Sequence, residues 1–259
     1  MNASKTNRII LRNDNWGDAV SENILAVLTS TIELFEENIQ PENFNSKLVV
    51  VQNSNDHKPP IDHPIMYKGN PENFIFLSVQ DRFWANYSYQ FSHEYCHHLI
   101  ESDFINSNDS FGWFEESLCE LASIHSIKNM AQTWKKIPPY PNWGGYSKTL
   151  DEYADEIINR ETNKIEIPLS NWVEANIIQL SKDRYDREKN CLIATNIANI
   201  FFNDPSFWNS ISYINKIKIS EDMVFSGFIE EWGNLLPEKN IHSWNLLKNR
   251  LINKAANKA

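Results

Sequence analysis

The β-strand patterns of this chain are confined to its first third, and this uneven distribution constrains the fold more than any other feature. β-Branched runs at 47–52 and 73–79 are bounded by Asn, Pro and Gly turn signals, which is typical of strands. Apolar residues with helical spacing precede them over 21–38 and follow them through most of the remaining chain. The sequence therefore predicts an α+β fold in which helices dominate the C-terminal part.

A loop rich in Pro and Gly at 137–146 divides the helical patterns into two groups. We therefore expect an N-terminal region, 1–136, that contains the sheet and a helical C-terminal lobe, 137–259, with a cleft between them in one functional unit. Helices are predicted at 84–101, 113–136, 150–160, 171–179, 186–202, 221–235 and 244–254.

Composition and charge exclude several classes of partner. The formal net charge is −10, so a basic surface for phosphate backbones is not expected and nucleic acid is an unlikely ligand. No apolar run approaches the roughly 18 residues of a membrane span, and residues 1–16 lack the apolar stretch of a secretory signal. We therefore expect a cytoplasmic protein without a membrane partner, although delivery elsewhere stays open. Three cysteines, an odd number, predict free thiols.

The chemistry-bearing motif is His93-Glu94-Tyr95-Cys96-His97, which lies within the predicted helix 84–101. Positions four apart differ by only about 40° around a helix, so His93 and His97 project from one face. Two imidazoles on one face can bind one Zn²⁺, and Glu94 then lies where it can act as a base toward a bound water.

A further ligand is predicted on the next helix, because catalytic zinc sites use three protein ligands and one open position. Glu116 lies 19 residues after His97 and shares a helix face with Glu120. One of these carboxylates suits a ligand, and the other suits an acceptor for the N–H of a ligating His. Glu115 is expected to be a solvated or capping carboxylate of the first turn. His98 and His125 are expected to point away from the metal, and Cys96 and Cys119 to be small buried residues.

The His93-Glu94-x-x-His97 motif, followed by Trp113-Phe114-x-Glu116-Ser117, resembles the gluzincin clan of zinc metallopeptidases, which includes thermolysin and the aminopeptidase N family. The resemblance covers roughly residues 73–123. It implies a zincin-like fold with Zn²⁺ held by His93, His97 and Glu116. It also implies that Glu94 is the general base and that Glu120 orients a ligating His.

Two weaker similarities concern the substrate. Gly69-Asn70-Pro71-Glu72-Asn73 resembles the Gly-x-Met-Glu-Asn segment of the clan's aminopeptidases, in which Glu grips the free amine. Glu72 is therefore a candidate substrate-binding residue, although the segment also has the composition of a plain turn. The clan holds the oxyanion with a Tyr or His of the helical half. Tyr185 is our candidate, and the rivals are Tyr146, Tyr153 and His242.

The sequence hypothesis is thus a zinc metallopeptidase that hydrolyses peptide bonds of a peptide or protein substrate. We expect the substrate to lie extended along an edge strand at 74–79. The alternative is a zincin-fold protein that binds a peptide or partner without turnover. Whether the enzyme would be an exo- or an endopeptidase stays open.

Overall fold

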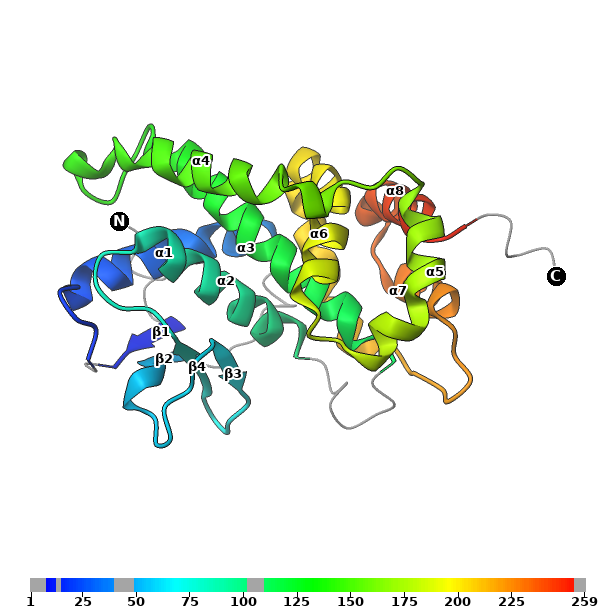
Figure 1. Ribbon diagram of the computed structural model, residues 1–259, viewed down its shortest axis with the longest axis horizontal. Helices are drawn as coiled ribbons and strands as arrows, with labels where there is room; N and C mark the ends of the chain where they lie inside the picture. The colour runs from blue at the N-terminus through cyan, green and yellow to red at the C-terminus, as the bar shows by residue number, and fades with distance from the viewer. Residues whose placement is uncertain (1–7, 13–14, 40–48, 102–109, 254–259) are drawn as a thin grey trace. The chain divides into compact units, whose positions relative to one another are not determined.

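The computed structural model describes residues 8–12, 15–39, 49–101 and 110–253, which form mostly helices and one four-stranded sheet (Figure 1). This composition agrees with the α+β class predicted from the sequence. By their contacts the residues form two compact units, and α3 (Gly112–Trp134) runs through both. Unit 1 comprises Met1–Glu37, Phe44–Leu99 and Ala122–Ile157, and unit 2 comprises Asn38–Asn43, Ile100–Leu121 and Ile158–Ala259. The division at 136/137 stays a prediction.

The sheet of unit 1 has the strand order β1-β2-β4-β3. β1 (Ile9–Leu11), β2 (Val49–Asn53) and β4 (Asn73–Leu77) are parallel, and β3 (Ile65–Tyr67) runs antiparallel to β4. The predicted strands at 47–52 and 73–79 correspond to β2 and β4, although 47 and 48 lie outside the described residues. β4 is an inner strand, so its predicted place at an edge was wrong. The edge strands are β1 and β3, each only three residues long, and this brevity gave no period-2 pattern to detect.

Helices α1 (Ser21–Asn38) and α2 (Trp84–Ile100) lie on the same side of the sheet (Figure 1). They meet the second half of α3 at a small polar contact inside unit 1. The Ser88 hydroxyl accepts a hydrogen bond from Thr31 Oγ1 at 3.0 Å and donates to Met130 Sδ at 3.1 Å. A buried hydroxyl pair with partners on all three helices fixes their rotation about their axes. The side of α2 that carries Ser88 therefore faces the interior of unit 1.

The beginning of α2 and the loop after α3 are joined by aromatic packing within unit 1. Trp143 stacks on Trp84 with ring centroids 5.2 Å apart and contacts Trp134 at 5.4 Å. α4 (Tyr146–Ile158) then returns along α3, where the Lys128 ammonium bridges Asp151 and Asp155 at 2.7 and 2.6 Å. The Pro- and Gly-rich loop therefore folds back onto unit 1.

Unit 2 is helical and has an aromatic core. Phe114 of α3 packs against Phe225, Phe228 and Trp232 of α7, with ring centroids 5.5 to 6.2 Å apart. The 3₁₀ helix η6 (Pro205–Lys216) was not predicted, because its three-residue turns do not follow the α-helical period. The remaining helices correspond to the predicted patterns within about four residues at each end: α5 (Leu169–Lys182), α6 (Arg187–Asn203), α7 (Phe225–Leu235) and α8 (Ile241–Leu251).

No helix in the described part of the chain has both the length and the apolar character needed to cross a membrane. The longest of these helices, α3, has 23 residues but carries three glutamates in its first three turns.

Two glycines of α7 provide a direct test of packing in unit 2. A Cβ built on Gly233 would lie 2.2 Å from the Trp244 ring of α8, whereas a Cβ on Gly227 would meet only Met223 Cγ at 3.7 Å. We expect Gly233→Ala to lower the free energy of unfolding by about 1 to 3 kcal/mol through overpacking. Gly227→Ala should raise it by about 0.4 to 1 kcal/mol, because the helical backbone there accepts Ala without strain and Ala restricts the unfolded chain. Denaturant unfolding of both variants checks this. Equal effects would show that α7 and α8 do not pack in this way.

Candidate metal and catalytic site

The two histidines of the motif lie together on α2. Between Phe91 and Ile100, every side chain is buried except those of His93 and His97, which are half-exposed. Their ring centroids are 5.2 Å apart, with an interplanar angle of 65°. The accessible strip of this part of the helix thus consists of two imidazoles one turn apart, as the spacing predicted.

This separation fits a shared metal ion. With Zn–N bonds of about 2.0 to 2.1 Å and tetrahedral geometry, the centroids of two imidazoles on one ion lie roughly 5 Å apart. The separation of the two rings is therefore compatible with one shared ion, and an imidazole pair suits Zn²⁺ well. Glu94 is buried beside them on the same helix, so its carboxylate is largely withdrawn from bulk water.

His98 and His125 do not belong to this pair. His98 is buried, its Nδ1 lies 2.8 Å from the Asn73 amide nitrogen, and its ring lies 5.3 Å from that of Tyr95. His98 is therefore a residue of the core and not of the accessible strip. His125 is also buried on α3, and burial lowers its pKa to about 3. This histidine is therefore neutral near pH 7.

The candidate substrate segment around Glu72 forms a tight turn before β4. The Gly69 amide donates to Asn73 Oδ1 at 3.1 Å, and a Cβ on Gly69 would lie 2.0 Å from the Glu72 carbonyl oxygen. Only glycine fits that approach, so the turn itself explains Gly69 and Asn73. Glu72 is half-exposed, and its role in gripping a substrate amine stays a prediction.

The first part of α3, in unit 2, carries three buried carboxylates. Glu115, Glu116 and Glu120 are 9%, 7% and 8% exposed. This burial contradicts the solvated alternative for Glu115, while the capping alternative stays a prediction. Glu116 Oε1 lies 3.8 Å from Nη2 of Arg184, whose side chain is itself only 16% exposed. A buried carboxylate is costly unless a positive charge or donor compensates it, and Arg184 provides that compensation within unit 2.

Glu120 has a hydrogen-bond partner within unit 2, the thiol of Cys191 on α6. Burial, reinforced by the charge of Glu120, raises the pKa of Cys191 to about 11. The thiol therefore keeps its proton near pH 7 and can donate it to the carboxylate. Asn163 Nδ2 lies 3.5 Å from the same sulfur. The predicted bond of Glu120 to a ligating His stays a prediction.

We expect Glu120→Ala to weaken zinc binding by about 10- to 100-fold, the usual cost of losing an outer hydrogen-bond partner of a ligand. The zinc dissociation constant, measured by chelator competition, checks this. Cys191→Ala is the matched control, because it removes the donor to Glu120 and leaves the carboxylate in place. Unchanged affinity in a folded Glu120→Ala variant would make Glu120 a purely structural acid.

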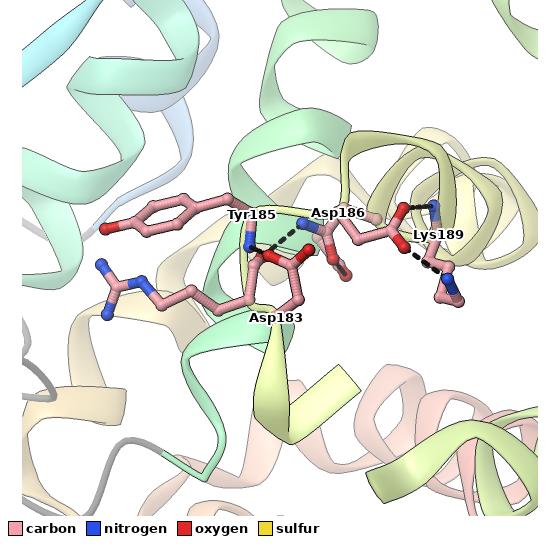
Figure 2. Close-up of polar contacts among 7 residues, drawn as sticks. Asp183, Tyr185, Asp186 and Lys189 are labelled. Atoms are coloured by element: carbon pink, nitrogen blue, oxygen red, sulfur yellow. Dashed lines mark hydrogen bonds and ion pairs between the residues drawn. The ribbon is translucent and has the colours of Figure 1, made fainter. Parts of the chain in front are cut away.

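The oxyanion candidate, Tyr185, lies in the turn between α5 and α6 and is 65% exposed (Figure 2). Its amide donates to Asp183 Oδ1 at 3.2 Å. Asp186 caps α6 by accepting a hydrogen bond from the Lys189 amide at 3.1 Å, and it also pairs with the Lys189 ammonium. The backbone at Tyr185 is therefore fixed on both sides while its side chain faces outward. The rivals differ in position: Tyr146 and Tyr153 belong to unit 1, and His242 is an exposed residue of α8.

Two residues of this region were not predicted from the sequence. Arg184 contacts Glu116, and Cys191 contacts Glu120. In each pair the partners lie about 70 residues apart in the chain, so no local sequence pattern predicts the contact. None of the three cysteines forms a disulfide, as predicted, and all three are buried, which the sequence predicted for Cys96 and Cys119.

No protein-family model, no curated protein and no solved structure matches this chain.

Proposed function

We propose that this chain is a zinc-dependent metallopeptidase with a zincin-like fold. The observation that carries the proposal is the pair of half-exposed imidazoles, His93 and His97, at a separation that suits one ion, with Glu94 buried beside them. Bound zinc would supply a water of lowered pKa and polarise the scissile carbonyl.

In this proposal Glu94 is the general base and then the general acid. A carboxylate that takes a proton from the attacking water can return it to the leaving amine, so one residue serves as base and then as acid. Tyr185 is the proposed donor to the oxyanion, from the helical unit.

The third ligand comes from α3 in this proposal, and two residues compete for the role. Glu116 is favoured by the resemblance to gluzincins. Cys119 forms, with His93 and His97, a group of residue types that could hold a metal ion. Cys119 is therefore a rival that sequence analysis had assigned to simple packing.

The edge of the sheet at β3 suggests which class of substrate the protein would bind. β3 is an antiparallel edge strand, and within the described ranges of the chain no other strand pairs with its outer side. An extended peptide can add to such an edge through backbone hydrogen bonds. Backbone pairing accepts many side-chain sequences, so we propose a peptide or unfolded protein segment as the substrate.

Zinc-loaded protein incubated with a mixed peptide library tests the proposed function, with cleavage products identified by mass spectrometry. Cleavage that a chelator abolishes supports the peptidase. Retained zinc and peptide binding without cleavage would establish the alternative, a binding protein without turnover.

A further inference from the structure

We infer that Arg184 is the counter-ion of Glu116 in the metal-free protein and that it competes with the metal for this carboxylate. The inference rests on the proposed function, because it takes Glu116 as a ligand. It assigns a role to Arg184, a residue that no sequence pattern singled out.

Arg184 compensates the charge of Glu116. Glu116 is buried, and the guanidinium of Arg184 lies 3.8 Å from its Oε1. Removing one member of a buried ion pair leaves an uncompensated charge, which is more costly than the pair itself. Without metal, Arg184 therefore stabilises the folded state of unit 2.

Arg184 is held in place through both its backbone and its side chain. Its carbonyl oxygen accepts a hydrogen bond from Asn190 Nδ2 at 2.7 Å, and Asn190 Oδ1 lies 3.3 Å from the Ser117 hydroxyl, next to Glu116. Its guanidinium carbon lies 4.6 Å from the centre of the Tyr185 ring. The positive charge is thus anchored to the same turn of α3 that carries Glu116.

Arg184 and a bound metal ion would therefore compete for the Glu116 carboxylate. A divalent cation at Glu116 meets a fixed positive charge beside its ligand and is repelled by it, and both cations attract the same carboxylate. Arg184 should therefore lower the metal affinity while it stabilises the protein without metal. A merely structural arginine would stabilise the metal-free and metal-loaded proteins equally.

The test is Arg184→Met in the full chain, with Arg250→Met as the matched control. Arg250 is also in unit 2, but it bonds to the Asn196 carbonyl. The readouts are the zinc dissociation constant, measured by chelator competition, and the melting temperatures with and without zinc. We expect the Arg184 variant to bind zinc at least about tenfold more tightly, because loss of a nearby like charge is worth that much at a partly buried site. Its metal-free melting temperature should fall, and its increase on adding zinc should exceed that of the wild type.

If the Met variant does not fold, Arg184→Gln replaces it, because Gln keeps hydrogen-bond donors but carries no charge. We expect the same gain in zinc affinity from this variant. In a Glu116→Gln background, Arg184→Met should no longer change zinc binding. Unchanged or weaker zinc binding in both Arg184 variants, with zinc bound by the wild type, overturns the inference and leaves the proposed function standing. A wild type that binds no zinc overturns the proposed function itself.

Discussion

Replacing Glu94 by Gln should lower peptide hydrolysis by at least about 100-fold, and by as much as about 10⁴-fold, because general acid–base catalysis contributes this range. Gln is close to isosteric with Glu but cannot accept the proton of the attacking water. Glu94 is not one of the proposed ligands, so zinc content and melting temperature should stay close to those of the wild type. Initial rates on a peptide cut by the wild type provide the measurement.

Glu115→Gln is the matched control for this experiment, since Glu115 is another buried carboxylate with no assigned part in the chemistry. It should retain activity. Peptide binding, measured by calorimetry, should persist in Glu94→Gln because the β3 edge is unchanged. Hydrolysis by Glu94→Gln at the wild-type rate would place the chemistry elsewhere.

Replacing His97 by Ala should reduce zinc affinity by more than about 100-fold, since loss of a direct ligand exceeds the 10- to 100-fold cost of losing an outer partner. Elemental analysis of the dialysed protein measures the occupancy, with about one Zn²⁺ per chain expected for the wild type. His98→Ala is the control on the same helix: it removes the bond to Asn73 and should destabilise the fold while zinc stays bound. Loss of zinc in the His98 variant but not in the His97 variant would refute the assignment.

The same assay identifies the third ligand. If Glu116 is the ligand, Glu116→Ala should lose zinc and Cys119→Ala should keep it. The reverse result would assign Cys119 and leave Glu116 as the partner of Arg184.

Sequence patterns predicted well those features that depend on local periodicity. The helix expected at 21–38 has these bounds in the structure, and the four-residue spacing of His93 and His97 does place both rings on one face. Both results follow from the 3.6-residue turn, which each segment specifies by itself.

Features that depend on pairing between distant segments were not predictable in this way. The place of β4 inside the sheet is decided by the three residues of β3, which are too few to show a strand period. The burial of Glu115 likewise depends on what covers α3, and its first-turn position suggested solvent instead. Long-range partners such as Arg184 for Glu116 arise only once the chain is folded.

The most direct test of a zinc peptidase is one digestion with three arms. Zinc-loaded wild-type protein, the same protein after chelation, and the chelated protein with zinc restored are each incubated with a mixed peptide library, and the products are counted by mass spectrometry. We predict cleavage in the first arm, none in the second and recovery in the third, because in the proposed mechanism His93 and His97 would hold the ion on which the attacking water depends. Equal cleavage in all three arms, or none in any arm while the loaded protein holds zinc, would contradict the proposed function.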